Sequence, residues 1–256
     1  MPILEVTNIT KQFGGLTANS NISMNVEEGS ITAVIGPNGA GKTTFFNMIT
    51  GVYQPTSGDI KLNNQSFLGF KPDEVAKRGI SRTFQNIRLF GEMSVIENVL
   101  IGMHTHLKAN LLDILLNIPT TKKEEIEAEK EAYRLLKYFG LSSLLNEKAC
   151  NLSYGAQRKL EIARALATKP KLILLDEPAA GMNPKETKEL TDIIKKMGKE
   201  FNVSILLIEH DMKLVMWMSE PIIVLDHGEK IAEGNPDAIR SNPKVIEAYL
   251  GSAAVH

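Results

Sequence analysis

One glycine-rich stretch has the residue types and spacing needed to bind the phosphates of a nucleotide. Residues 36–44 fit the pattern G-x-x-x-x-G-K-[ST]. Glycines let a backbone wrap closely around phosphate oxygens with its N–H groups pointing inward. We expect Lys42 to reach the β- and γ-phosphates and the Thr43 hydroxyl to bind Mg²⁺. The candidate phosphate loop therefore comprises Gly36, Pro37, Asn38, Gly39, Ala40, Gly41, Lys42, Thr43 and Thr44.

Two adjacent acidic residues follow an apolar run further along the chain. Residues 172–175 read Leu-Ile-Leu-Leu, and Asp176 and Glu177 come directly after them. A parallel strand delivers the residues at its carboxyl end to the ligand crevice of an α/β sheet. We expect Asp176 to hold Mg²⁺, directly or through water, and Glu177 to orient an attacking water as general base. The chain has no Asn-Lys-x-Asp motif of the kind that reads a guanine base.

The elements that must position these side chains alternate between strand and helix patterns. Residues 31–35 read as a strand buried on both faces, directly before the phosphate loop. Similar apolar runs at 172–175, 203–208 and 222–225 alternate with helical spacing, and Asn183-Pro184 resembles a helix start. This alternation predicts an α/β fold with a mostly parallel sheet.

Other parts of the chain carry different patterns. Apolar residues alternate with polar ones near Leu4 and Val6, and again at 22–26, as in a half-buried antiparallel sheet. Residues from about 89 to 170 read as an inserted helical subdomain. Within it, residues 122–140 predict a helix with an apolar stripe and a stop at Gly140; the stripe comprises Ile126, Tyr133 and Leu136. We expect one domain over 1–256, ending in a short helical tail from about 236 to 256.

Composition excludes several classes of protein. The 256 residues carry 29 Lys plus Arg and 30 Asp plus Glu, a net charge of −1 that argues against a nucleic-acid binder. Cys150 is the one cysteine, so no internal disulfide and no cysteine-based metal site can form, and we expect it to be a small buried hydrophobe. No run approaches the roughly 18 apolar residues of a membrane span, and the N-terminus does not read as a signal peptide. A membrane role then requires a partner.

Four more motifs occur in a fixed order around the first two. Gln85 lies in Thr-Phe-Gln-Asn after the phosphate loop, and residues 152–156 read Leu-Ser-Tyr-Gly-Ala before a helical pattern. Residues 179–183 follow the acidic pair, and His210 closes the predicted strand at 203–209. With the phosphate loop, this ordered set resembles the ATP-binding subunits of ABC transporters. The resemblance covers essentially the whole chain and implies a P-loop ATPase that hydrolyses ATP with Mg²⁺ as cofactor.

The resemblance implies roles for five further residues. Ser153 and Gly155 belong to the signature that closes over the γ-phosphate of ATP held by a second subunit. Gln85 lies between the nucleotide and the membrane partner and touches Mg²⁺ or its water. His210 contacts the γ-phosphate, and the aromatic ring of Phe13 stacks on adenine. A complete site then needs two chains, with Lys42 of one chain on one side of the ATP and Ser153 of the other chain on the opposite side.

The sequence departs from the common family pattern at three positions. Many signatures read Leu-Ser-Gly-Gly-Gln, whereas Tyr154 and Ala156 stand at the third and fifth positions here. Asn183 stands where an aspartate is common, which weakens charge-based contact between subunits. An asparagine still suits the cap of the following helix.

Finer likeness points to one subgroup. The stretches RTFQNIRLFGEMSVIENVL, LDEPAAGMNPKETKEL, LLIEHDMKLVM and NPKVIEAYLG resemble the ATPases of high-affinity branched-chain amino-acid importers. The ATPase of lipopolysaccharide export shares the LSYG signature, but the additional residues 104–121 favour the importer. Export of lipopolysaccharide, transport of another solute and a non-transport assembly scaffold remain as alternatives.

The same resemblance implies the partners. It predicts a second ATPase subunit, either a sister or an identical chain, and integral membrane permeases. A periplasmic binding protein would act indirectly, and no nucleic acid is expected. The predicted place is the cytoplasmic face of the inner (plasma) membrane, as a peripheral subunit.

Overall fold

The computed structural model describes residues 1–103 and 119–253, which form two compact units. The first unit comprises Met1–Arg82, Lys171–Pro178 and the described part of Thr191–His256. The second comprises the described part of Thr83–Pro170 together with Ala179–Leu190. The chain therefore passes from the first unit to the second at two places, after Arg82 and after Pro178.

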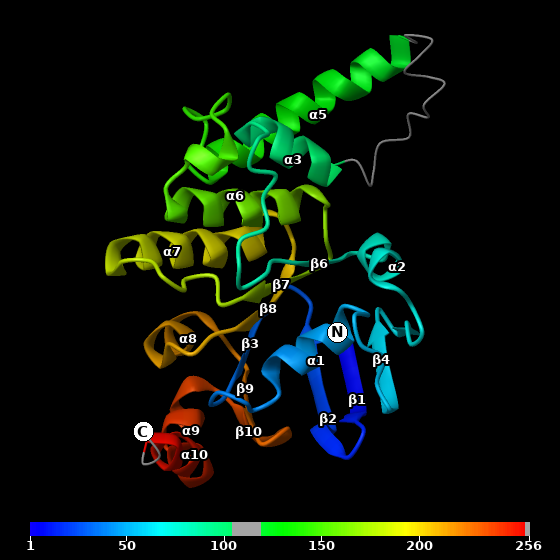
Figure 1. Ribbon diagram of the computed structural model, residues 1–256, viewed down its shortest axis with the longest axis vertical. Helices are drawn as coiled ribbons and strands as arrows, with labels where there is room; N and C mark the ends of the chain where they lie inside the picture. The colour runs from blue at the N-terminus through cyan, green and yellow to red at the C-terminus, as the bar shows by residue number, and fades with distance from the viewer. Residues whose placement is uncertain (104–118, 254–256) are drawn as a thin grey trace. The chain divides into compact units, whose positions relative to one another are not determined.

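A six-stranded, mostly parallel sheet forms the centre of the first unit (Figure 1). Strands β9, β3, β8, β7 and β6 pair in parallel, and β10 pairs antiparallel with β9 at one edge. All five residues of β7 and of β8 are buried, as their continuous apolar runs predict. The strands in spatial order are β10 (Glu229–Gly234), β9 (Ile222–Asp226), β3 (Ile31–Ile35), β8 (Ser204–Ile208), β7 (Leu172–Asp176) and β6 (Ile80–Arg82).

A second, antiparallel sheet belongs to the same unit. Along β1 and β2, residues such as Leu4, Val6, Ile22 and Met24 are buried on one face, as the alternating pattern predicts. The α/β fold with parallel and antiparallel sheets is confirmed. The strands in spatial order are β2 (Leu16–Glu27), β1 (Pro2–Phe13), β4 (Ser57–Leu62) and β5 (Gln65–Ser66).

Helix α1 (Lys42–Ile49) packs into the core that both sheets share. Phe45, Phe46, Met48 and Ile49 are at most 1% exposed and belong to one cluster with residues from both sheets. Burial of these large side chains fixes the helix that follows the phosphate loop. The other helices that lie wholly in this unit are α2 (Pro72–Lys77), α8 (Met212–Met218), α9 (Pro236–Arg240) and α10 (Pro243–Ala253).

The second unit is helical. Helices α3 (Val95–Met103) and α5 (Pro119–Tyr138) both pack on α6 (Tyr154–Ala167), which follows the short 3₁₀ turn η1 (Ala149–Asn151) (Figure 1). A side chain at Gly102 would lie 2.4 Å from the carbonyl oxygen of Arg164, so α3 and α6 approach closely there. Helix α7 (Pro184–Glu200) begins in this unit and ends in the first.

Two sequence predictions about the helical unit need correction. In the predicted apolar stripe of α5, Leu136 is buried as expected, but Ile126 is 51% exposed and Tyr133 is 45% exposed. The buried face is formed by Ala132, Leu135 and Leu136 of α5 and by Phe139, which directly follows the helix. These four residues are three, one and three positions apart, so they lie on one face of a helix. Cys150 is exposed rather than buried, because η1 turns Ala149 inward instead.

None of the helices at residues 1–103 and 119–253 is both long and apolar enough to cross a membrane. Most of residues 104–121, which favoured the importer in the sequence, lie outside the described residues.

Candidate functional site

The phosphate loop connects β3 to α1, and its glycines are sterically required. Gly36 has a φ of +152°, and a Cβ there would lie 2.1 Å from the carbonyl oxygen of Leu225. Gly41 has a φ of +92° and precedes the first residue of α1, where a Cβ would lie 2.6 Å from the carbonyl oxygen of Ala18. No other residue fits these positions without moving backbone atoms. The loop therefore leads directly into the N-terminus of α1, a position suited to an anion.

Lys42 is held inside this loop. Its Nζ donates to the carbonyl oxygens of Gly36 at 2.8 Å and Pro37 at 2.9 Å. Burial lowers the pKa of Lys42, while the negative charges of Glu177 and then Asp176 raise it. Lys42 and the acidic pair therefore attract each other electrostatically. The neighbouring Thr43 is exposed.

Glu177 and His210 meet at the carboxyl ends of two neighbouring strands. The backbone N–H of Glu177 donates to the carbonyl oxygen of Ile208 at 3.0 Å, and His210 Nδ1 lies 3.5 Å from Glu177 Oε1. Glu177 has a φ of +46°, a left-handed conformation that side chains other than glycine adopt rarely and that clusters at functional sites. A phosphate loop with a carboxylate pair and a histidine suits the transfer of a phosphoryl group to water.

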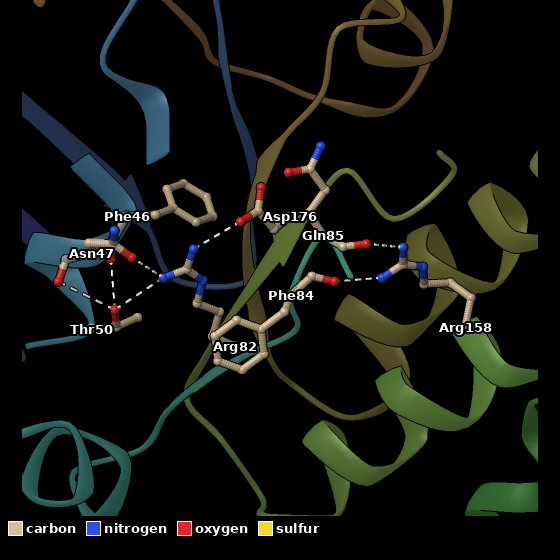
Figure 2. Close-up of polar contacts among 8 residues, drawn as sticks. All are labelled: Phe46, Asn47, Thr50, Arg82, Phe84, Gln85, Arg158 and Asp176. Carbon is tan, nitrogen blue, oxygen red and sulfur yellow. Dashed lines mark hydrogen bonds and ion pairs between the residues drawn. The ribbon is translucent and has the colours of Figure 1, made fainter. Parts of the chain in front are cut away.

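Asp176 has a partner that the sequence did not predict. Arg82, the last residue of β6, donates from Nη2 to Asp176 Oδ2 at 2.9 Å (Figure 2). Each of the two side chains is only 8% exposed. Arg82 Nη1 donates to Asn47 Oδ1 at 2.6 Å and to Thr50 Oγ1 at 3.4 Å, so the guanidinium joins Asp176 to the end of α1. Its carbon lies 5.8 Å from the centre of the Phe46 ring.

Phe13 lies at the end of β1 and is 41% exposed, so it is a surface aromatic and not a core residue. Its ring forms a T-shaped pair with the Tyr53 ring, with centroids 5.2 Å apart. The ammonium of Lys11 lies 5.0 Å from the Phe13 ring centre. An exposed aromatic face of this kind suits the stacking of a planar base.

In the second unit, the signature begins helix α6. Ser153 caps the helix, and its Oγ accepts from the backbone N–H of Ala156 at 3.4 Å. Gly155 is buried, and a Cβ there would lie 3.2 Å from Glu186 Oε1 and 3.4 Å from Met182 Cε. The signature therefore packs against the segment that follows the acidic pair.

Asn183 caps α7, as its sequence context predicts. Its Oδ1 accepts from the backbone N–H groups of Lys185 and Glu186, both at 3.0 Å. Glu186 Oε2 in turn accepts from the backbone N–H of Asn183 at 3.2 Å, which completes a reciprocal cap. The departure from aspartate at position 183 therefore preserves the helix start.

The exposed Gln85 is tied through its backbone to the signature helix. Arg158, which is 0% exposed, donates to the carbonyl oxygens of Phe84 and Gln85, both at 2.7 Å (Figure 2). The same guanidinium donates to Glu161 Oε2 at 2.9 Å and to the Tyr154 hydroxyl at 3.1 Å. One buried side chain thus fixes the backbone on which Gln85 is presented.

The structure accordingly groups the predicted residues by unit. The phosphate loop, Phe13, the acidic pair and His210 belong to the first unit, and Gln85, Ser153 and Gly155 to the second. Sequence reasoning missed Arg82 and Arg158. Signals for both exist: Arg82 stands three residues before Gln85, and Arg158 follows Tyr154 and precedes Glu161 at helical spacing.

Comparison with protein families supports one assignment over most of the chain. Residues 19–180 match the model described as "ABC transporter". Residues 229–255 match a model for the branched-chain amino acid ATP-binding cassette transporter.

Curated proteins of similar length agree with this. The chain is 50% identical to a protein of Pseudomonas aeruginosa called the high-affinity branched-chain amino acid transport ATP-binding protein BraF. It is 49% identical to the Escherichia coli protein of the same description, LivG. Each comparison covers 98% of this chain and 99% of the relative.

Solved structures agree as well. An ATP-binding cassette of an ABC transporter in its ADP conformation superposes with a TM-score of 0.85 at 36% identity, covering 98% of this chain and 99% of that one. A dimeric cassette in a post-hydrolysis state, bound to ADP and phosphate, gives a TM-score of 0.76 at 28% identity, covering 91% of this chain and 98% of that one.

Proposed function

Because this chain belongs to the ABC transporter family and is an ATPase of that family, we propose that its ATP hydrolysis powers the import of branched-chain amino acids. The observation that carries this proposal is the near-complete mutual coverage with BraF and LivG at 50% and 49% identity. The match of residues 229–255 to a branched-chain transporter model supports it independently of the catalytic motifs.

The residues of the first unit carry the hydrolysis. Lys42 and backbone N–H groups of the phosphate loop bind the phosphates, and Phe13 stacks on adenine. Glu177 accepts the proton of the attacking water, and His210, 3.5 Å from it, contacts the γ-phosphate. The rare backbone conformation of Glu177 supports this role, since strain of this kind persists where the surrounding structure holds a functional group in place.

Thr43, Gln85 and Asp176 suit Mg²⁺, because hydroxyl, amide and carboxylate oxygens are its preferred ligands. Among residues 1–103 and 119–253 no cluster of three His, Cys, Asp or Glu side chains suits a metal ion. Mg²⁺ is commonly held by one or two protein oxygens together with phosphates and water, so the Thr43 hydroxyl and the Asp176 carboxylate, both in the first unit, fit a metal that enters with ATP. When bound, it would neutralise charge on the β- and γ-phosphates.

The complete ATP site forms between two chains. Ser153 and the N–H groups at the start of α6 would close over the γ-phosphate of ATP held by the other subunit, since a helix N-terminus favours an anion. The dimeric cassette among the similar structures supports this arrangement. The second subunit is a sister or an identical chain. Both subunits dock peripherally on integral membrane permeases at the cytoplasmic face of the inner membrane. A periplasmic binding protein acts indirectly, by delivering substrate to the permeases.

Replacement of the proposed general base tests the catalytic assignment. Glu177→Gln preserves shape and hydrogen-bonding capacity but cannot accept a proton, so ATP binding should persist while phosphate release falls by at least about 100-fold. The variant should also remain dimeric with ATP. Glu200→Gln, at the exposed end of α7, is the matched control and should behave as wild type. Normal phosphate release by Glu177→Gln would reject Glu177 as the base.

A further inference from the structure

Asp176 is already neutralised by an arginine that is held in place from a second side. Arg82 Nη2 lies 2.9 Å from Asp176 Oδ2. On its other side, the same guanidinium donates to Asn47 and Thr50 at the end of α1. Because α1 is fixed by the buried Phe45 and its neighbours, the positive charge of Arg82 stays beside Asp176.

A second cation acts on the same carboxylate. Lys42 interacts electrostatically with Glu177 and, more weakly, with Asp176. Two positive side chains, Arg82 and Lys42, therefore balance the two carboxylates of Asp176 and Glu177.

Without nucleotide, binding of a divalent cation at Asp176 is opposed by electrostatic repulsion from Arg82. Mg²⁺ lies about 2.0–2.1 Å from a carboxylate oxygen when bound directly, or one water further out. An ion held by the Asp176 carboxylate would lie near the guanidinium that donates to the same carboxylate at 2.9 Å, and like charges repel at short range in a protein. The phosphates of ATP bring negative charge that reverses this balance.

We propose that Arg82 is a positioning residue that makes the binding of Mg²⁺ at Asp176 depend on bound nucleotide. The inference rests on the proposed function, in which Asp176 is a metal ligand. Arg82 holds the Asp176 carboxylate in one orientation and neutralises its charge. Binding of Mg²⁺ alone is therefore disfavoured, whereas binding of Mg²⁺ together with the phosphates of ATP is favourable.

Charge-altering variants of the full chain test this without any measurement of catalysis. Arg82→Gln removes the charge and keeps an amide donor, and Arg82→Lys keeps the charge. Arg78→Gln is the matched control, because Arg78 lies in the same unit, stacks on Phe70 at 4.2 Å and does not bind Asp176. The two readouts, both without nucleotide, are Mn²⁺ affinity by electron paramagnetic resonance and the shift of Tm with added Mg²⁺.

We expect Arg82→Gln to bind free Mn²⁺ at least about tenfold more tightly than wild type, since a nearby positive charge is lost. Mg²⁺ should also raise the Tm of this variant, because it replaces the missing counter-charge of a buried carboxylate. Wild type, Arg82→Lys and Arg78→Gln should show neither effect. A merely structural role of Arg82 predicts a lowered Tm that Mg²⁺ does not restore, and that result would overturn the proposal.

Two further comparisons complete the test. If Arg82→Gln does not fold in chelating buffer, the proposal predicts that its refolding yield recovers with Mg²⁺; an equal yield with and without the metal contradicts it. Asp176→Asn separates this inference from the proposed function. If Asp176→Asn binds Mn²⁺ with ATP as tightly as wild type, the metal role of Asp176 fails, and the inference fails with it. If Asp176→Asn loses that binding but Arg82→Gln is indifferent to metal, only the inference fails.

Discussion

Removal of the Arg158 side-chain charge should destabilise the helical unit strongly. Arg158 is 0% exposed, and its guanidinium donates to two backbone carbonyls, to Glu161 and to the Tyr154 hydroxyl. Arg158→Met keeps the apolar stem but leaves Glu161, itself 1% exposed, as a buried carboxylate without this partner. Breaking one side of a buried ion pair costs about 3–5 kcal/mol. We therefore expect the free energy of unfolding to fall by about that amount.

A matched pair on the surface provides the control. Arg134 and Glu131 on α5 have the same i,i+3 spacing and lie 2.7 Å apart, but 59% of the Arg134 side chain is exposed. Arg134→Met should change the free energy of unfolding by at most about 1 kcal/mol. The double variant Arg158→Met/Glu161→Leu removes both charges and should recover a large part of the loss.

Urea unfolding measures these differences. Far-ultraviolet circular dichroism reports the helices of both units, whereas fluorescence reports Trp217, the one tryptophan of the chain, which lies in the first unit. Arg158→Met should shift the dichroism transition to lower urea. Equal shifts in Arg158→Met and Arg134→Met, or a double variant no better than Arg158→Met alone, would refute the reasoning.

Two other predictions concern the first unit. Gly36→Ala places a Cβ 2.1 Å from the Leu225 carbonyl oxygen, so the free energy of unfolding should fall by about 1–3 kcal/mol, and nucleotide affinity should fall with it. The control Gly15→Ala meets open space and should retain both quantities within about 0.5 kcal/mol. Urea unfolding and nucleotide titration measure the two effects. Burial raises the pKa of Tyr249 from 10.0 to about 12. The unfolded chain therefore loses this proton at lower pH than the folded chain, so the free energy of unfolding should fall as pH rises from about 10 to 12. Tyr249→Phe should weaken that dependence. An unchanged pH dependence of Tm in Tyr249→Phe would contradict the raised pKa of Tyr249.

The phosphate loop and the strands around it were predictable because their signals are local. The loop glycines, Lys42 and the apolar run before Asp176 lie within short stretches whose chemistry allows few alternatives. Asn183 was identified as a helix cap for the same reason, since its hydrogen bonds join residues two and three positions apart.

The distant partners of Arg82 and Arg158 were not predictable from the sequence, unlike the contacts of Arg158 with Tyr154 and Glu161 in its own helix. Arg82 and Asp176 are 94 residues apart, and Arg158 and Phe84 are 74 residues apart. Only the pairing of β6 with β7, and the packing of α6 against residues 84–88, bring them together. The predicted apolar stripe of α5 was wrong at Ile126 and Tyr133 but right at Leu136, because the small Ala132, and not the larger Tyr133, lies on the buried face.

Uptake of labelled leucine by the native cells tests the central claim most directly, with wild type compared to chromosomal Glu177→Gln and to the control Glu200→Gln. The proposed function predicts that leucine uptake is lost in Glu177→Gln and kept in Glu200→Gln, while transport of unrelated solutes continues in both. Unchanged leucine uptake in Glu177→Gln would contradict the proposed import of branched-chain amino acids.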